Sequence, residues 1–126
     1  MIGTVLQVAA GGAIGASGRY LTGVAATKLI GHGYPWGTMI VNVVGSFAMG
    51  MLVVYLMSKD GGTRYAPLLM TGVLGGFTTF SAFSLDALTI FERGETMSAL
   101  IYVLATVILS ILAIFIGLSV ARGIWA

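Results

Sequence analysis

The spacing of the charged residues constrains this chain more than any motif in it. The ten charged side chains leave four long stretches without charge. These stretches cover residues 1–18, 29–58, 65–85 and 96–121. A helix needs about 20 consecutive apolar residues to cross a lipid bilayer. The pattern therefore predicts up to four membrane-spanning helices.

The composition supports this interpretation. Only 8% of the residues are charged and 58% are hydrophobic, with a mean hydropathy of +1.04. A soluble domain carries about 25% charged residues, so this chain lacks the charge to cover a water-facing surface. Four spans use about 88 residues, which leaves short loops only. A soluble enzyme and a disordered tail are both excluded.

We therefore expect an all-α membrane protein with one four-helix transmembrane domain over residues 1–126. The expected spans are residues 2–26, 37–57, 66–91 and 96–121. The first residues lack the basic segment of a cleavable signal peptide, so they are assigned to the first span. Tyr34 and Trp36 precede the second span and suit the membrane–water interface.

The sequence lacks the residues that several classes of function require. The chain has no cysteine, which removes disulfides, thiolate metal sites and cysteine nucleophiles. The single His32 lies in a loop containing glycines and a proline. With no acid pair in the spans, nothing supports acid–base catalysis, and we predict that the protein is not an enzyme. The six basic residues are scattered, so no nucleic-acid partner is expected.

Basic residues are divided evenly between the two expected sides of the membrane. The side with both termini carries Lys59, Arg64 and Arg122, and the other carries Arg19, Lys28 and Arg93. The positive-inside rule reads a difference between the sides, and here there is none. Either one loop charge hides a weak bias, or the chain inserts both ways and pairs as an antiparallel dimer. Small size favours the dimer, because four packed helices fill their own interior.

The third expected span contains an irregular segment, Thr71–Ser84. Its middle joins Gly75 and Gly76 to Thr78 and Thr79, which are poor helix formers. Irregular backbone at membrane depth is tolerated only inside protein or along a wet cavity. Broken helices offer free carbonyls to cations and helix N-termini to anions. The alternative is an unbroken helix with a glycine-rich packing surface.

Other residues of the spans have two interpretations each. Phe80 and Phe83 share a helix face and contact either lipid or, through their partially positive ring edges, a small anion. Asn42 needs partners at mid-membrane and is either structural or an amide donor to an anion. Arg19 either snorkels to the interface or draws anions into a vestibule.

The fourth span carries a row of hydroxyl groups spaced four residues apart. Its members are Tyr102, Thr106 and Ser110, which lie on one helix face. Such a row forms either an interhelical hydrogen-bond seam or a track of hydroxyls that replaces water around a moving ion.

Together these elements resemble one family, the Fluc/CrcB fluoride channels of bacteria, over nearly the whole chain. The residues that carry the resemblance are Gly11-Gly12 through Gly15 to Arg19, Gly37-Thr38, Val41-Asn42, Gly45, and Gly72 to Ser84. The most specific of them is the run Gly75-Gly76-Phe77-Thr78-Thr79-Phe80-Ser81.

The resemblance implies a fluoride-specific channel in the bacterial plasma (inner) membrane that exports cytoplasmic fluoride passively and gives fluoride resistance. It implies an antiparallel, dual-topology homodimer with two pores, surrounded by lipid, and a structural sodium ion at the two-fold axis. The sodium ligands correspond to the backbone carbonyls of Gly75 and Thr78. The fluoride path corresponds to Asn42, Thr79, Phe80, Ser81, Phe83, Tyr102, Thr106 and Ser110, and the vestibule to Arg19.

Two positions depart from the family pattern. Ala82 stands where many members have threonine and Asp86 where glutamate is usual, so the resemblance does not extend to the details of conductance. The main rival is a small multidrug-type proton-coupled antiporter, which needs a membrane carboxylate. The first span has none, and Asp86 is the only acid within any span. A noncatalytic assembly subunit is also compatible with the composition.

Overall fold

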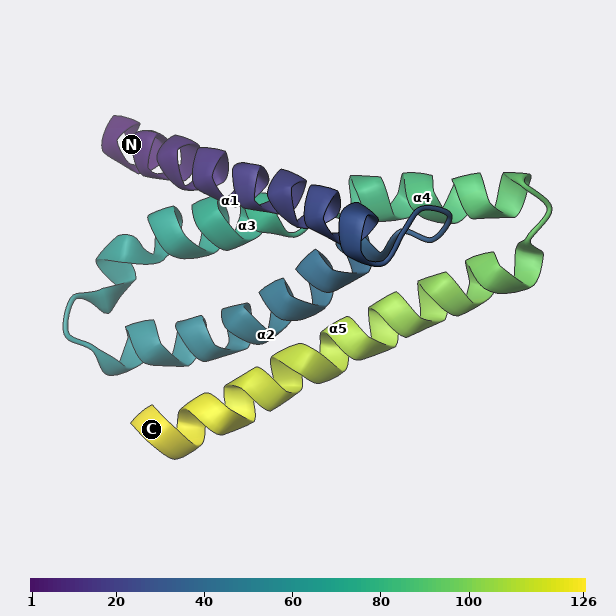
Figure 1. The fold of residues 1–126 in the computed structure, drawn as a ribbon. Coiled ribbons are helices and arrows are strands. Elements are labelled where there is room, and N and C mark those ends of the chain that lie inside the picture. Colours follow the sequence, from purple (N-terminus) through teal and green to yellow (C-terminus); the bar gives the residue numbers. More distant parts are fainter.

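The computed structural model describes residues 1–126 and contains helices and short connections but no strand (Figure 1). Two elements are irregular helices, a 3₁₀ turn (η1) and a π-helix (η2). In chain order the elements are α1 (Ile2–Leu29), α2 (Trp36–Ser58), η1 (Gly62–Tyr65), η2 (Pro67–Leu74), α3 (Gly75–Phe77), α4 (Ser81–Glu92) and α5 (Thr96–Trp125).

The helices run back and forth along one common direction. Helix α1 lies along η2 and α3, and α2 lies along α5, which are the most extensive contacts in the molecule. Figure 1 shows both termini at the same end, with α4 and the start of α5 forming the opposite end. This up-and-down order is the arrangement expected of consecutive helices joined by short loops.

Three segments are long and apolar enough to cross a membrane. They are Trp36–Ser58, Gly62–Glu92 and Thr96–Trp125. Helix α1 has a comparable length, 28 residues, but it is less apolar because of its glycines, Gln7 and Arg19. Its outward-facing side nevertheless carries large apolar residues such as Ile14, which is 63% exposed.

Glycines let α1 approach η2 and α3 backbone to backbone. A Cβ atom on Gly11 would lie 2.9 Å from the Cα atom of Gly72, and one on Gly76 would lie 2.9 Å from the carbonyl oxygen of Gly12. Gly15 is packed against the carbonyl group of Val73 in the same way. Small residues allow such close helix contacts in membranes, where packing drives association.

The third long segment is interrupted at residues 78–80, which confirms the predicted break. Thr78 has an extended backbone (φ −87°, ψ 160°), and helical structure resumes at Ser81. Within the predicted segment Gly75 and Gly76 are themselves helical, so the interruption falls on the threonines that follow them. Gly76 packs against the α1 backbone at Gly12 and Ala16, which favours the helical form at this point, and the chain leaves the helix only after Phe77.

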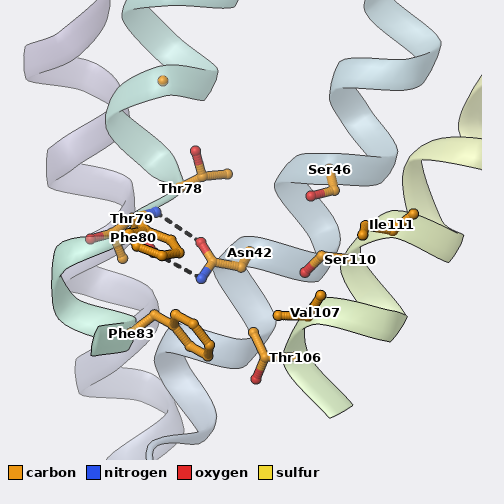
Figure 2. A pocket seen from close by; sticks show the side chains of 11 residues that line it. Asn42, Ser46, Thr78, Thr79, Phe80, Phe83, Thr106, Val107, Ser110 and Ile111 are labelled. Carbon is orange, nitrogen blue, oxygen red and sulfur yellow. Dashed lines mark hydrogen bonds between the residues drawn. The ribbon is translucent and has the colours of Figure 1, made fainter. Parts of the chain in front are cut away.

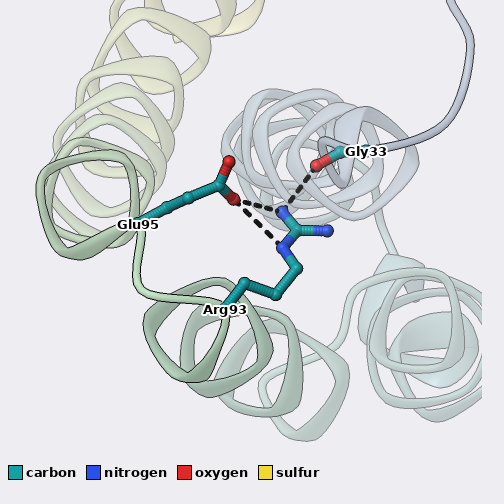
Figure 3. Close-up of polar contacts among 3 residues, drawn as sticks. All are labelled: Gly33, Arg93 and Glu95. Atoms are coloured by element: carbon teal, nitrogen blue, oxygen red, sulfur yellow. Dashed lines mark hydrogen bonds and ion pairs between the residues drawn. The ribbon is translucent and has the colours of Figure 1, made fainter.

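At one end of the molecule Arg93, which follows α4, makes exposed polar contacts with two loops (Figure 3). Its Nη2 atom donates to the carbonyl oxygen of Gly33 at 2.8 Å and forms an ion pair with Glu95 at 2.9 Å. The neighbouring Tyr34 ring contacts Tyr102 edge-on at 5.5 Å, and burial raises the pKa of the Tyr34 hydroxyl. These contacts join the α1–α2 loop to the α4–α5 turn.

A cluster of five buried apolar residues lies toward this same end. Its members are Met39, Phe83, Ile90, Ala99 and Tyr102. Tyr102 is fully buried and contacts the Phe83 ring at a centroid distance of 5.4 Å. This cluster therefore fixes Phe83 next to the interruption, where the candidate site lies.

Candidate functional site

A groove of about 420 Å³ lies beside the interruption, between α2 and α5 (Figure 2). It is lined by polar but uncharged side chains and a few apolar ones. The lining residues are Asn42, Ser46, Gly75, Thr78, Thr79, Phe80, Phe83, Thr106, Val107, Ser110 and Ile111. The structure thus brings together, in one groove, most of the site residues suggested by the sequence.

Asn42 fastens the interruption to α2. Its side-chain Nδ2 donates to the carbonyl oxygen of Thr79 at 2.9 Å, and its Oδ1 accepts from the Thr79 backbone N–H at 2.8 Å (Figure 2). The side chain therefore pairs both backbone groups of a residue that has left the helix. One N–H of the Asn42 amide is not used by these two bonds. The structural interpretation of Asn42 holds, and its amide keeps a donor beside the groove.

Thr79 also starts the second half of the interrupted segment. Its Oγ1 accepts a hydrogen bond from the backbone N–H of Ala82 at 3.2 Å, in the first turn of α4. A threonine hydroxyl in this position satisfies one of the free N–H groups at a helix N-terminus. On the other side, Thr78 Oγ1 donates back to the carbonyl of Leu74 at 2.9 Å.

The carbonyls of Gly75 and Thr78 are left without a hydrogen-bond donor. In an unbroken helix Gly75 would accept from the N–H of Thr79, which instead donates to Asn42. Thr78 would accept from the N–H of Ala82, which instead donates to the Thr79 hydroxyl. Free carbonyls in a membrane are costly unless they coordinate a cation or water. Both therefore suit a cation.

The two phenylalanines lie at the mouth and the base of the groove. Phe80 is 77% exposed, whereas Phe83 is only 7% exposed. Their ring centroids are 5.6 Å apart, and both rings lie beside Asn42 in Figure 2. Ring edges carry a partial positive charge, so this pair offers weak electrostatic contacts to an anion.

The hydroxyl row on α5 has two different parts. Thr106 is 3% exposed, and its Oγ1, like the Oγ of Ser110, is buried without a hydrogen-bond partner. The structure shows no hydrogen-bond seam at these two residues, and both line the groove. Tyr102 does not line it, and its hydroxyl instead donates to Asp86 Oδ2 at 3.2 Å.

Arg19 and Ser81 lie outside the groove. Arg19 lines a second cavity of about 530 Å³, together with Lys28, Thr38, Ala82 and others, and Thr79 is the one residue that lines both cavities. The Oγ of Ser81 lies 3.5 Å from the Oγ1 of Thr79, at the edge of the interruption. The structure therefore separates a cavity with cations from a groove without charge.

The sequence analysis missed Ser46. It lines the groove from α2, one turn after Asn42. A spacing of four residues places two side chains on the same helix face, so the signal was present in the sequence. With Ser46 the groove has hydroxyl groups on both α2 and α5.

The groove offers donors and ring edges without a fixed charge. None of its lining residues is titratable, and no cluster of three His, Cys, Asp or Glu side chains occurs anywhere in the chain. Such a site replaces the hydration shell of an ion through many weak contacts, which lets the ion leave again. An interrupted helix beside an uncharged polar groove is typical of membrane transport proteins. The fold and the groove together place the chain in this class of membrane transport proteins.

Within that class, comparison with known sequences identifies the family. Residues 6–118 match the profile of the family described as "CrcB-like protein, Camphor Resistance (CrcB)". The chain belongs to this family, which confirms the resemblance seen in the sequence.

Similar curated proteins share nearly the full length of the chain. A protein of Cereibacter sphaeroides is 60% identical over 123 residues, covering 98% of each chain. Proteins of Paracoccus denitrificans and Mesorhizobium japonicum are 52% and 51% identical, covering at least 95% of each chain. All three are named fluoride-specific ion channel FluC.

Proposed function

We propose that this chain is a fluoride-specific ion channel that exports cytoplasmic fluoride passively, which lowers intracellular fluoride and gives fluoride resistance. The similar protein of Cereibacter sphaeroides matches 98% of the chain and is named a fluoride-specific ion channel, which supports this function. The observation that carries it is the uncharged groove beside the interruption, with Asn42, Phe83 and Thr106 on its walls.

The groove suits a small, strongly hydrated anion. A pore must replace the water around fluoride with close hydrogen-bond donors. The free N–H of Asn42 and the unpaired hydroxyls of Thr106 and Ser110 are such donors. A fixed ammonium or guanidinium group would hold fluoride too tightly, and none lines the groove. Arg19 and Lys28 lie in the neighbouring cavity, where they attract anions without trapping them.

A structural sodium ion would belong at the interruption. The carbonyls of Gly75 and Thr78 lack donors, which fits a hard cation that prefers oxygen ligands. When bound, the ion supplies positive charge near the groove without blocking it. The two carbonyls of one chain are too few to enclose a cation, so a site at a two-fold axis, with two carbonyls from each copy, completes the set.

The same reasoning favours an antiparallel homodimer of four-span subunits. The groove wall is open in one chain, because Phe80 is 77% and Ile111 is 63% exposed. An ion path has to be closed off from lipid, and a second copy supplies the missing wall. The equal numbers of basic residues on the two sides fit dual insertion, and the bacterial inner membrane is the proposed location.

Fluoride release from liposomes tests the function. The purified protein, reconstituted in vesicles loaded with potassium fluoride, should release fluoride to an external electrode. Valinomycin should speed the release, because passive anion flow needs a compensating cation flow. Vesicles loaded with potassium chloride should release no chloride. Equal release of chloride and fluoride contradicts the proposal.

A second arm of this test separates the channel from the proton-coupled antiporter. The only acid within a span, Asp86, accepts a hydrogen bond from Tyr102 and does not line the groove. We expect fluoride release without a proton gradient, and Asp86→Asn should still release it. Release that requires a proton gradient and vanishes in Asp86→Asn supports the antiporter instead.

A further inference from the structure

Arg19 contacts the interrupted segment directly, which its assignment to a vestibule does not explain. Its Nε atom donates to the carbonyl oxygen of Gly76 at 3.0 Å, across 57 positions of sequence. The close glycine contacts between α1 and α3 bring that carbonyl within reach. Arg19 therefore bonds to the last turn before the chain leaves the helix.

This bond replaces one that the interruption removes. In an unbroken helix the carbonyl of Gly76 would accept from the N–H of Phe80. The chain turns away at Thr78, and no such bond is present. A free carbonyl at this depth is costly. The Nε–H of Arg19 occupies the place of the missing backbone donor.

We propose that Arg19 is a positioning residue for the interruption, through its Nε–H bond to Gly76. The carbonyls of Gly75 and Thr78 at the interruption stay free, whereas the carbonyl of Gly76, in the last helical turn, is fixed by a side chain from another helix. Fixing the Gly76 carbonyl orients the last helical turn. It thereby sets where the free carbonyls point and in which direction the chain continues to Thr79. This inference rests on the proposed channel function, because it concerns the shape of the same groove.

The positive charge of Arg19 strengthens its bond to the Gly76 carbonyl. The carbonyls at the end of a helix carry a partial negative charge, which a cation stabilises. A hydrogen bond from a charged donor is stronger than one between neutral groups. The other N–H groups of the guanidinium are not used by this bond, and Arg19 also lines the cavity that contains Lys28 and Thr38. One side chain thus serves both the interruption and the cavity.

Three substitutions of Arg19 separate the donor from the charge. In Arg19→Gln the amide nitrogen stands as many bonds from Cα as the arginine Nε, so the donor stays and the charge is lost. In Arg19→Lys the charge stays, but a methylene group takes the Nε position. In Arg19→Met both are lost while an unbranched side chain is kept. Fluoride release from liposomes is then measured at low and high ionic strength.

The proposal predicts that Arg19→Gln releases fluoride faster than Arg19→Lys. Arg19→Lys and Arg19→Met should fall by about tenfold or more at every ionic strength, because a charge-assisted bond is lost. Arg19→Gln should fall by at most about fivefold at low salt, the effect of one partly exposed charge. At high salt its deficit should shrink further, because screening reduces the role of the charge.

Lys28→Gln is the matched control. Lys28 lines the same cavity but makes no hydrogen bond with the interrupted segment. Its substitution should reproduce the salt-dependent part of the Arg19→Gln effect and nothing else. The proposal is overturned if Arg19→Gln is as slow as Arg19→Met, or if Arg19→Lys keeps its release while Arg19→Gln loses it.

A measurement on the unmodified protein covers the case in which the variants do not fold. Solid-state NMR in bilayers, with ¹⁵N in arginine and ¹³C in the glycine carbonyls, measures dipolar coupling between Arg19 Nε and Gly76. A strong coupling supports the proposal, and no coupling overturns it. This contact is independent of ion flow. If the unmodified protein released no fluoride while the coupling was present, the channel function would fail and the positioning role would stand.

Discussion

The two halves of the interrupted segment are held by different kinds of contact. Before the interruption, η2 and α3 lie against α1 through glycines, so backbone meets backbone. After it, α4 packs against α5 through side chains, among them Phe83 and Ile90. The first half is therefore held rigidly against α1, which fixes the position of its C-terminal carbonyls. The second half is fitted by side chains and brings the phenylalanines to the groove.

The interruption between them is held by neither half alone. Arg19 bonds to it from α1, and Asn42 bonds to it from α2. This difference teaches that a channel-forming irregularity in a small protein needs a rigid side and partners from other helices. Substitutions that disturb the rigid side should have the largest effect on the whole molecule.

The largest effect is expected for Gly15→Ala. A Cβ atom there would overlap the Val73 carbonyl oxygen and lie 2.8 Å from the backbone nitrogen of Phe77. Backbone atoms cannot turn aside, so we expect a loss of stability of at least about 3 kcal/mol. Thermal unfolding in detergent and the yield of folded protein measure it.

Gly12→Ala is the control for this substitution. A Cβ atom on Gly12 would meet nothing within 4 Å. Alanine also favours the helix over glycine by about 1 kcal/mol, so stability should be unchanged or slightly raised. If both variants unfolded alike, the rigid backbone contact would not distinguish the two halves.

Next in size is Asn42→Leu, which releases the interruption from α2. Two hydrogen bonds are lost, and the N–H and carbonyl of Thr79 are left unpaired. We expect a loss of about 2 kcal/mol or more in unfolding free energy, with fluoride release reduced to background. The exposed bond of Ser58 at the end of α2 gives a control, since Ser58→Ala should change stability by less than about 0.5 kcal/mol. Wild-type stability in Asn42→Leu contradicts the role of Asn42.

A smaller effect of unusual sign is expected for Thr106→Val. The buried hydroxyl of Thr106 has no partner in the chain. Replacing it with a methyl group should leave stability unchanged or raise it by about 1 kcal/mol, while fluoride release falls severalfold. Unfolding and release are measured on the same preparation. A fall in stability would restore the hydrogen-bond seam as the role of this row.

The smallest effect is expected for Arg93→Ala, at the end of the molecule far from the glycine contacts. The Arg93 and Glu95 side chains are 44% and 52% exposed, and such pairs contribute at most about 1 kcal/mol. The loss should diminish at high salt. Arg64→Ala, which removes an exposed arginine side chain that makes no hydrogen bond, should show no loss. A loss as large as that of Asn42→Leu would mean that this end also holds the interruption.

Much of the fold could be predicted from the sequence because membrane helices follow local rules. Long uncharged stretches indicate helices, and the Gly-Gly-Phe-Thr-Thr run indicated an interruption. The position of the interruption could not be predicted to the residue. Low helix propensity is shared by Gly75, Gly76, Thr78 and Thr79, but both glycines are helical, and Gly76 packs against the backbone of α1.

The candidate site was predictable in its members but not in its bonds. Residue types and helix spacing pointed to Asn42, Phe83 and Thr106, and the structure places all three in one groove. The partner of Asn42 lies 37 positions away and that of Arg19 lies 57 positions away. One sequence carries no signal for such pairs, because they depend on how whole helices pack.

The central claim is passive, fluoride-selective conduction through the groove beside the interruption. The most direct test is the zero-current potential of the reconstituted protein in a planar bilayer, with a tenfold fluoride gradient and equal chloride on both sides. A fluoride-selective channel gives a potential of about 59 mV, the equilibrium value for one monovalent ion, and an added pH gradient leaves it unchanged. A potential near zero, or one that follows the pH gradient, contradicts the account.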